Sequence, residues 1–318
     1  MTLTLGGIHH VTAVTGKAPE NLDFYRRVLG LRLVKKTVNQ DVTSSYHLFY
    51  GDEEGHPGTE MTFFDWPRVG NHLKGIGDVS ATAFMVPDEA LDWWSAHLDR
   101  ENVHQEEIET RNNRLVLPFT DPEGQRLELI EGGGSEAVPW KDSHVPAEFA
   151  IHGLAAVTLV VGAIDASATF LEKSLGFRKA GEYVFPDNPS RKAVVMETGP
   201  GGLGTEVHLE SRPDLPPAQV GIGGVHHVAF RTPNDEEHRQ WRSHLANSRV
   251  GVTEVIDRYY FRSIYFREPG GVLFEIATDG PGFTGDEALA HLGESLSLPP
   301  FLEARRAEIE AQLTPLPS

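Results

Sequence analysis

The sequence predicts an α+β protein built from four βαβββ modules in two tandem halves, because it repeats itself internally. The segment from His10 to Leu33 aligns without a gap over the segment from Ala156 to Lys179, an offset of 146 residues. The segment from Ala81 to Leu98 aligns at the same offset over the segment from His227 to Leu245, with one inserted residue. Repeats of this kind identify a modular architecture before any single motif is considered.

Each module opens with an apolar strand and a helix. The strand is "HHVTAV" in the first module and "HHVAF" in the fourth. In the first module Pro19 suits the start of a helix and Gly30 suits the position just after its end. Between them, apolar residues recur with a 3.6-residue period at Leu22, Tyr25, Val28 and Leu29.

Three further strands complete each module, separated by turns rich in Gly, Pro and Asp such as "DPEGQ" and "EPGGV". The predicted organisation is an N-terminal half (1–135), a linker (136–150), a C-terminal half (151–280) and a C-terminal extension (281–318). The extension is expected to end in an amphipathic helix with Leu302, Ile309 and Leu313 on one side.

The composition excludes several classes of function. The formal net charge of -18 over 318 residues repels phosphate backbones and anionic lipid, so neither nucleic acid nor membrane is an expected partner. The absence of cysteine excludes disulfides, thiolate metal sites and a Cys nucleophile. No apolar run approaches the roughly 18 residues of a membrane span, and no signal peptide is recognisable, so we expect a cytoplasmic protein.

The four modules differ at two equivalent positions that bear on chemistry. On the first strand these are His10, Ala81, Ala156 and His227, and on the last strand they are Thr62, Glu128, His208 and Glu275. Modules 1 and 4 together therefore offer two imidazoles and one carboxylate, whereas modules 2 and 3 have alanine at both first-strand positions. A purely structural repeat has no reason to keep paired histidines in two strands of four.

Two His and one carboxylate with open positions suit a non-heme Fe(II) site that activates O₂. The same ligands, His10, His227 and Glu275, can also hold Mn²⁺ or a catalytic Zn²⁺. The alternative is that they are hydrogen-bonded core residues. Side chains alternate along a strand, so His9 and His226 can face the same way as their neighbours only if the strands are locally irregular. We expect one metal per chain, between modules 1 and 4.

The motifs "HHVTAVTG", "YHLFYGDEEGHPGTEMTFF", "GVHHVAFRT" and "DRYYFRSIYFREPGGVLFEIATD" extend this pattern over nearly the whole chain. Together with the four modules, they resemble the vicinal oxygen chelate superfamily and, within it, the ring-cleaving dioxygenases of hydroquinones and chlorohydroquinones. The resemblance implies modules that form cupped, barrel-like mixed sheets. It also implies Fe(II) on His10, His227 and Glu275, with a small aromatic compound and O₂ as substrates.

The resemblance further implies a set of residues around the metal, which here are His9, Thr12, His226, Arg258 and Tyr265. The substrate hydroxyl must lose a proton, and negative charge must be stabilised as oxygen attacks the ring. His226 is the predicted base, with His9 second, because neutral imidazole titrates in a suitable range. Arg258 and Tyr265 are predicted to act in catalysis as hydrogen-bond donors and, with Thr12, to bind the substrate.

Three competing functions remain at this point. Extradiol catechol dioxygenases have a His on the first strand of module 3, where this chain has Ala156, so a para-dihydroxylated ring is favoured. A glyoxalase-type lyase or isomerase needs a fourth, carboxylate ligand where this chain has Thr62. A non-enzymatic binder of small molecules would lack the three ligands. The sequence leaves the ring substituents, the cleavage position and a homo-oligomeric state open.

Overall fold

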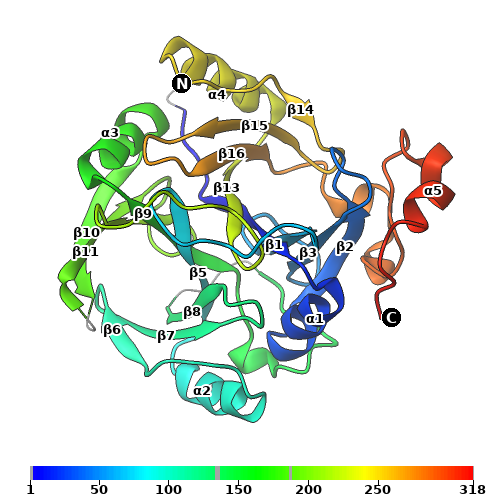
Figure 1. The fold of residues 1–318 in the computed structure, drawn as a ribbon, viewed down its shortest axis with the longest axis horizontal. Coiled ribbons are helices and arrows are strands. Elements are labelled where there is room, and N and C mark those ends of the chain that lie inside the picture. The colour runs from blue at the N-terminus through cyan, green and yellow to red at the C-terminus, as the bar shows by residue number, and fades with distance from the viewer. Residues whose placement is uncertain (1–2, 133–136, 186–187, 318) are drawn as a thin grey trace.

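The computed structural model describes residues 3–132, 137–185 and 188–317, whose strands form two eight-stranded sheets (Figure 1). The strand orders are β14-β15-β16-β13-β1-β4-β3-β2 and β10-β11-β12-β9-β5-β8-β7-β6. Both sheets mix parallel and antiparallel neighbours. The predicted α+β class, with four modules in cupped sheets, is confirmed. The expected boundary between N-terminal half and linker, at residues 135 and 136, lies outside the described residues.

The first sheet joins module 1 to module 4. Its strands are β1 (Ile8–Thr15), β2 (Arg32–Val38), β3 (Tyr46–Gly51), β4 (Glu60–Asp65), β13 (Val225–Thr232), β14 (Ile256–Asp257), β15 (Arg262–Arg267) and β16 (Leu273–Thr278). The antiparallel pair β1 and β13 lies at its centre. The first strand of each module is therefore an interior strand, covered by neighbours on both sides.

The second sheet joins module 2 to module 3 in the same way. Its strands are β5 (Asp78–Val86), β6 (Glu109–Arg111), β7 (Arg114–Thr120), β8 (Arg126–Glu131), β9 (Leu154–Val161), β10 (Arg178–Phe185), β11 (Asn188–Glu197) and β12 (Glu206–Ser211). Here β5 and β9 form the central antiparallel pair. Each sheet therefore draws one module from each half of the sequence.

Four helices lie at the periphery, outside the sheets (Figure 1). They are α1 (Ala18–Asp23), α2 (Leu91–Arg100), α3 (Ile164–Leu175) and α4 (Asp235–Asn247). The helix predicted after Pro19 is present, but its second part, Phe24–Val28, widens into a π-helical turn. The predicted apolar stripe of this helix is buried. Gly30 follows with φ +73°, the left-handed conformation that favours glycine after a helix. Among the described residues, no helix is long and apolar enough to cross a membrane.

The central strands carry β-bulges at the positions where local irregularity was expected. The pairing of β1 with β13 skips His9 on one strand and His226 on the other. The pairing of β5 with β9 skips the equivalent Ser80 and Ala155. A bulge leaves one residue unpaired and re-aims its side chain. Bulges are therefore part of the repeated module, and only in the first sheet do they carry histidines.

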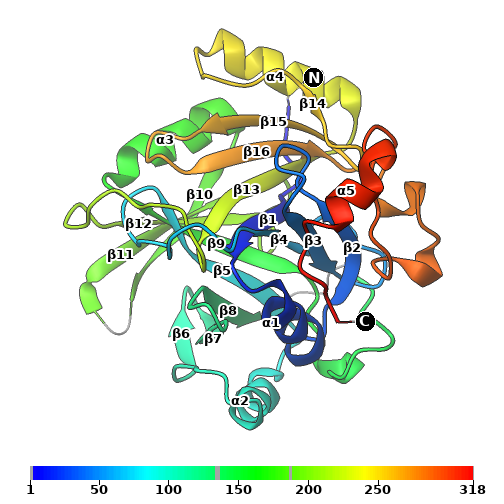
Figure 2. The same ribbon diagram turned by 45° about the vertical axis from the view of Figure 1, so that its right-hand side comes forward.

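The C-terminal extension packs along the β2 side of the first sheet (Figure 2). Ser297 N donates to the carbonyl of Lys36, which joins the extension to β2. The expected terminal helix is shorter than predicted, because α5 spans only Arg306–Glu310 after a 3₁₀ turn. The three apolar residues predicted to lie on one side of it are all buried: Leu302, Ile309 and Leu313.

Candidate active site

Three buried side chains from adjacent strands converge inside the first sheet. His10 lies on β1, His227 on β13 and Glu275 on β16. The two Nε2 atoms of the histidines are 3.3 Å apart. Glu275 Oε2 lies 3.4 Å from His10 Nε2 and 2.9 Å from His227 Nε2. The structure thus brings together the three residues that the sequence predicts as metal ligands, although they are separated by up to 265 positions in the chain.

In each His-His pair, the first histidine contacts the second and so orients its imidazole. His9 Nε2–H donates to the backbone carbonyl of Thr278 at 3.1 Å, so His9 Nδ1 must be an acceptor. His10 Nδ1 lies 3.0 Å from that atom and donates to it, which leaves a lone pair on His10 Nε2. His226 and His227 form the same contact, with their Nδ1 atoms 2.7 Å apart. Hydrogen bonds of this kind select the metal-binding tautomer of a histidine.

The donor set fits a divalent cation. The Nε2 atoms of the two imidazoles and a carboxylate oxygen of Glu275 face one another in a buried position. Glu275 Oε2 lies near both imidazoles without the alignment of a hydrogen bond, and it has no hydrogen-bond partner among the described residues. Ser263 Oγ donates to the other oxygen and so orients the carboxylate.

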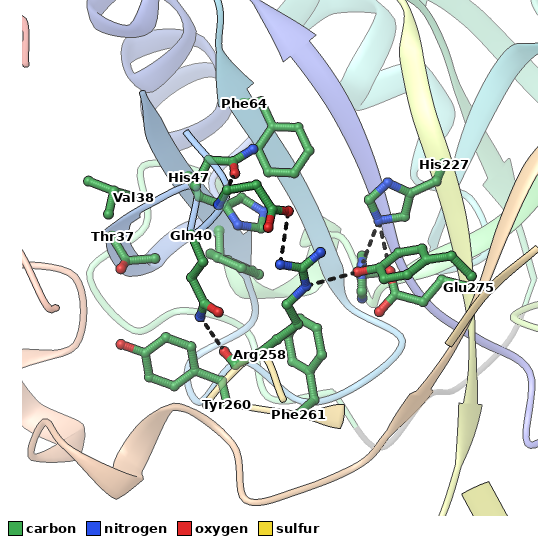
Figure 3. Close-up of a pocket in the computed structure, with 15 residues that line it drawn as sticks. Thr37, Val38, Gln40, His47, Phe64, His227, Arg258, Tyr260, Phe261 and Glu275 are labelled. Atoms are coloured by element: carbon green, nitrogen blue, oxygen red, sulfur yellow. Dashed lines mark hydrogen bonds and ion pairs between the residues drawn. The ribbon is translucent and has the colours of Figure 1, made fainter. Parts of the chain in front are cut away.

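A pocket opens directly onto this cluster, with an empty volume of about 440 Å³ including its mouth (Figure 3). Aromatic rings from three strands or turns form much of its wall: Phe49, Phe64 and Phe261. Apolar walls with a few polar groups are typical of sites for small organic ligands. The pocket is therefore suited to a flat aromatic ring placed beside the three ligands.

Polar groups at one side of the pocket come from the turn between β14 and β15. Arg258 Nε lies 3.3 Å from the hydroxyl of Tyr265, and Arg258 Nη1 forms an ion pair of 3.0 Å with Asp41. Gln40 Nε2 donates to the carbonyl of Arg258 (Figure 3). Tyr259, in the same turn, has φ +73°, a strained conformation for a non-glycine residue. The pocket therefore holds Arg258 and Tyr265 together, as the sequence predicts.

The remaining predicted residues lie behind the ligands. The residues that line the pocket do not include His9, His226 or Thr12. His226 packs edge-on against Phe64 and Trp66, and burial, followed by the neighbouring His227, lowers its pKa to about 3. The predicted role of His226 as catalytic base stays a prediction, since its position directly supports only the orientation of His227.

Sequence reasoning missed His47, which lines the pocket from β3. Its Nε2 lies 3.0 Å from Thr62 Oγ1, and Thr62 Oγ1 lies 2.8 Å from Thr12 Oγ1. The available signal was the alternation of "YHLFY", which places His47 and Phe49 on the same face of a strand. That face could be identified as the inner face only once the partner strands were known.

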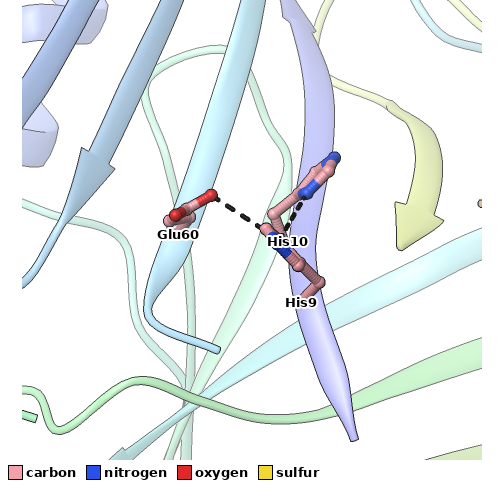
Figure 4. A group of neighbouring side chains, drawn as sticks. All are labelled: His9, His10 and Glu60. Atoms are coloured by element: carbon pink, nitrogen blue, oxygen red, sulfur yellow. Dashed lines mark hydrogen bonds and ion pairs between the residues drawn. The ribbon is translucent and has the colours of Figure 1, made fainter. Parts of the chain in front are cut away.

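A second group of ligand-type side chains adjoins the first and shares His10 (Figure 4). Glu60 Oε2 lies 3.8 Å from His9 Nδ1, and Glu60 is buried, with that oxygen lacking a hydrogen-bond partner among the described residues. Burial, followed by the charge of Asp52, raises the pKa of Glu60 well above its ordinary value. Because His10 already directs Nδ1–H toward His9, this group supports the first cluster and does not form a separate metal site.

The second sheet fills the equivalent positions with ion pairs. Glu128 is buried and accepts from Arg111 Nη2 at 2.8 Å, with Arg126 Nε at 3.3 Å. His208 Nε2 lies 3.0 Å from Glu206, and its Nδ1 lies 3.1 Å from the hydroxyl of Tyr183. Within the described ranges, no group of three metal-ligating side chains occurs here. The buried carboxylate of Glu128 therefore has two guanidinium partners.

Comparisons with known proteins agree with this geometry. A model of the Glyoxalase/Bleomycin resistance protein/Dioxygenase superfamily matches residues 7–129 and 153–276. The chain is 46% identical to "Putative ring-cleaving dioxygenase MhqA" of Bacillus subtilis over 99% of this chain and 100% of the relative. It is 33% identical to the chlorohydroquinone/hydroquinone 1,2-dioxygenase of Sphingobium indicum, over 95% of this chain and 94% of the relative. A crystal structure titled as a putative dioxygenase from Bacillus subtilis superposes with a TM-score of 0.92 at 40% identity, covering 99% of both chains.

Proposed function

Because the chain belongs to the Glyoxalase/Bleomycin resistance protein/Dioxygenase superfamily, we propose that it is an Fe(II)-dependent dioxygenase that cleaves a hydroquinone-type ring. The relatives of 33–46% identity over nearly the full length are named ring-cleaving dioxygenases, which supports an oxygenase. The para-dihydroxylated substrate, the iron and a cytoplasmic location are part of the proposal.

The observation that carries the proposal is the cluster of His10, His227 and Glu275 at the end of an aromatic pocket. Two His and one carboxylate leave part of the coordination sphere free for other ligands, as O₂-activating iron sites require. When bound there, Fe(II) would bring a ring hydroxyl and O₂ together and let electrons pass from the ring to O₂. The surrounding protein must then hold the ring, exclude water and accept one proton from a ring hydroxyl.

The pocket residues suit these tasks. Phe49, Phe64 and Phe261 offer ring faces and edges against which an aromatic substrate can pack. Arg258 is a permanent cation and can stabilise an oxyanion on the side of the ring away from the ligands. Burial, followed by the charge of Glu275, raises the pKa of Tyr265, so its hydroxyl stays protonated and can donate.

Three alternatives are less well supported by the residues at these positions. A glyoxalase-type lyase or isomerase would need a carboxylate at Thr62, which instead hydrogen-bonds to other side chains. An extradiol catechol dioxygenase would need a His at Ala156, which is a buried apolar residue of the second sheet. A simple binder would not need two histidines and a carboxylate brought together in this way.

The test is oxygen uptake after anaerobic loading with Fe(II). Hydroquinone, methylhydroquinone, chlorohydroquinone and catechol are offered separately, and the same protein loaded with Zn²⁺ serves as the control. We expect one O₂ to be consumed per ring opened, with at least one hydroquinone turned over faster than catechol. Faster turnover of catechol would contradict the substrate class, and no uptake with any ring would contradict the function itself.

A further inference from the structure

His47 occupies a position in the pocket that no predicted role accounts for. It lines the same cavity as His10, His227 and Glu275. Its ring lies between two aromatic neighbours, with ring centroids 4.0 Å from Phe49 and 4.5 Å from Phe64. The ring is thereby held at a fixed angle to the pocket, as a group that takes part in chemistry has to be.

The hydrogen bond of His47 arises from the difference between modules 1 and 4. Thr62 is the module 1 equivalent of the ligand Glu275, on the last strand next to the metal position. In place of a carboxylate, module 1 has a hydroxyl that bonds His47 Nε2 and Thr12 Oγ1. The position that would carry a fourth ligand therefore carries a hydroxyl group that hydrogen-bonds to a histidine of the pocket.

The contacts of His47 indicate the tautomer and the charge of its imidazole. If Nε2–H donates to Thr62, then Nδ1 carries the lone pair, and Nδ1 makes no hydrogen bond with the described residues. Burial lowers the pKa of His47 well below its ordinary value, and the neighbouring His10, His227 and Arg258 act in the same direction, whereas Glu275 opposes them. A neutral imidazole with a free lone pair thus faces the pocket.

We propose that His47 accepts the proton of a substrate ring hydroxyl, a role that rests on the proposed function. In this step the O–H bond breaks, the proton moves to Nδ1, and the electron pair stays on the ring oxygen. No oxidant or reductant takes part. The imidazolium that forms is stabilised by the new phenolate and by Glu275, and its Nε2–H still donates to Thr62 without any rearrangement. His226 has no such access, because its Nδ1 contacts His227 and it does not line the pocket.

The first test follows the proton without turnover. Protein labelled with [¹³C]histidine is loaded with diamagnetic Zn²⁺, and the ring signal of His47 is identified by its loss in His47→Gln. Anaerobic addition of hydroquinone above neutral pH should move this signal from the neutral to the imidazolium position. A signal that stays neutral while hydroquinone binds would overturn the proposal. Because this experiment needs neither iron nor O₂, its outcome does not depend on whether the protein is an oxygenase.

The second test is kinetic and uses the iron-loaded enzyme. His47→Gln should keep its metal and its affinity for hydroquinone but lose roughly 100-fold or more in kcat, the typical contribution of a general base. His291→Gln, at an exposed histidine of the extension, is the matched control and should be unchanged. Thr62→Val should lower kcat in the same direction, and Thr62→Ser should restore it. A His47→Gln enzyme with the kcat of the wild type would refute the role of His47, whereas an inactive wild type would refute the proposed function.

Discussion

Each His-His pair directs one imidazole toward the metal position and keeps the other behind it. The resemblance to the ring-cleaving dioxygenases implies that the second His of each pair is the ligand. It cannot predict how the first residue is oriented. That depends on a bulge, which is defined by the pairing of β1 with β13, two strands more than two hundred residues apart. The bulge brings His9 Nδ1 to 3.0 Å from His10 Nδ1.

We expect His9→Ala to weaken metal binding by about 10- to 100-fold while the fold is retained, because the hydrogen bond that orients His10 is lost. Ser80→Ala is the matched control, since Ser80 is the bulged residue at the equivalent place in the second sheet. The measurement is competition for Fe(II) or Zn²⁺ with a chelator of known affinity. Equal metal affinity in both variants would show that His9 does not support the ligand.

Strand β4 determines how many ligands the first sheet provides. Its Thr62 pairs in parallel register with Thr12 on β1, as Glu275 pairs with Ala229 on β13. The two last strands therefore approach the metal position in the same manner from opposite sides, and at this position only β16 carries a carboxylate.

Thr62→Glu should therefore convert a three-ligand site into a four-ligand site. We expect the variant to hold Zn²⁺ or Fe(II) at least as tightly as the wild type but to lose oxygen uptake, since one position needed by substrate or O₂ is filled. Metal titration and an oxygen electrode measure the two effects. Thr62→Gln has a similar volume without the charge, and it should not gain metal affinity. Full oxygen uptake in Thr62→Glu would contradict this account of β4.

The C-terminal extension is fixed to the first sheet by a buried cation. Lys35 on β2 is fully buried, and its Nζ donates to the carbonyl of Phe283 and forms ion pairs with Asp286 and Glu287. Asp286 also accepts from the hydroxyl of Tyr260, which lines the pocket. The extension thereby connects β2 to the turn that carries Arg258.

Lys35→Met should lower the free energy of unfolding by about 3 kcal/mol, because two carboxylates lose their buried partner. It should also raise KM for the ring substrate, since the Tyr260 contact is loosened. Lys36→Met is the control: the adjacent Lys36 bonds only a backbone carbonyl of the extension. Urea unfolding and steady-state kinetics check both effects. Equal stability of the two variants would show that the ion pairs of Lys35 do not hold the C-terminal extension on the first sheet.

At the scale of the whole molecule, the sheets combine modules from different halves, so module 1 meets module 4 and module 2 meets module 3. The sequence predicts this pairing from chemistry, because only His10, His227 and Glu275 make a complete ligand set. It does not predict that Arg111 and Arg126 neutralise Glu128, nor that His47 lines the pocket. Those contacts depend on how the strands beside the central pair are placed in three dimensions, which a periodicity of two residues does not encode.

The stability of the molecule should also depend on pH through Asp65, at the end of β4. Asp65 is buried, and its Oδ1 has no hydrogen-bond partner within the described part of the chain. Burial, followed by the charge of Glu123, raises its pKa from 3.8 to about 6. The folded state therefore binds more protons than the unfolded state between these values, and stability falls as the pH rises through this window.

Asp65→Asn should remove this penalty. We expect the variant to be more stable than the wild type by roughly 3 kcal/mol above the folded-state pKa. The difference should disappear below the ordinary pKa of 3.8, where both states carry the neutral acid. Thermal unfolding across this pH range is the measurement. A difference that does not change with pH would mean that the charge of Asp65 is not the cause.

The central claim is that one metal lies between modules 1 and 4, on His10, His227 and Glu275. The most direct test is the iron content of wild type, Glu275→Ala and His208→Ala after anaerobic loading with Fe(II) and removal of free metal. The two substitutions are at equivalent positions on the last strands of modules 4 and 3. The account predicts one iron per chain in the wild type and in His208→Ala, and almost none in Glu275→Ala. Two irons per chain in the wild type, or iron retained by Glu275→Ala, would contradict it.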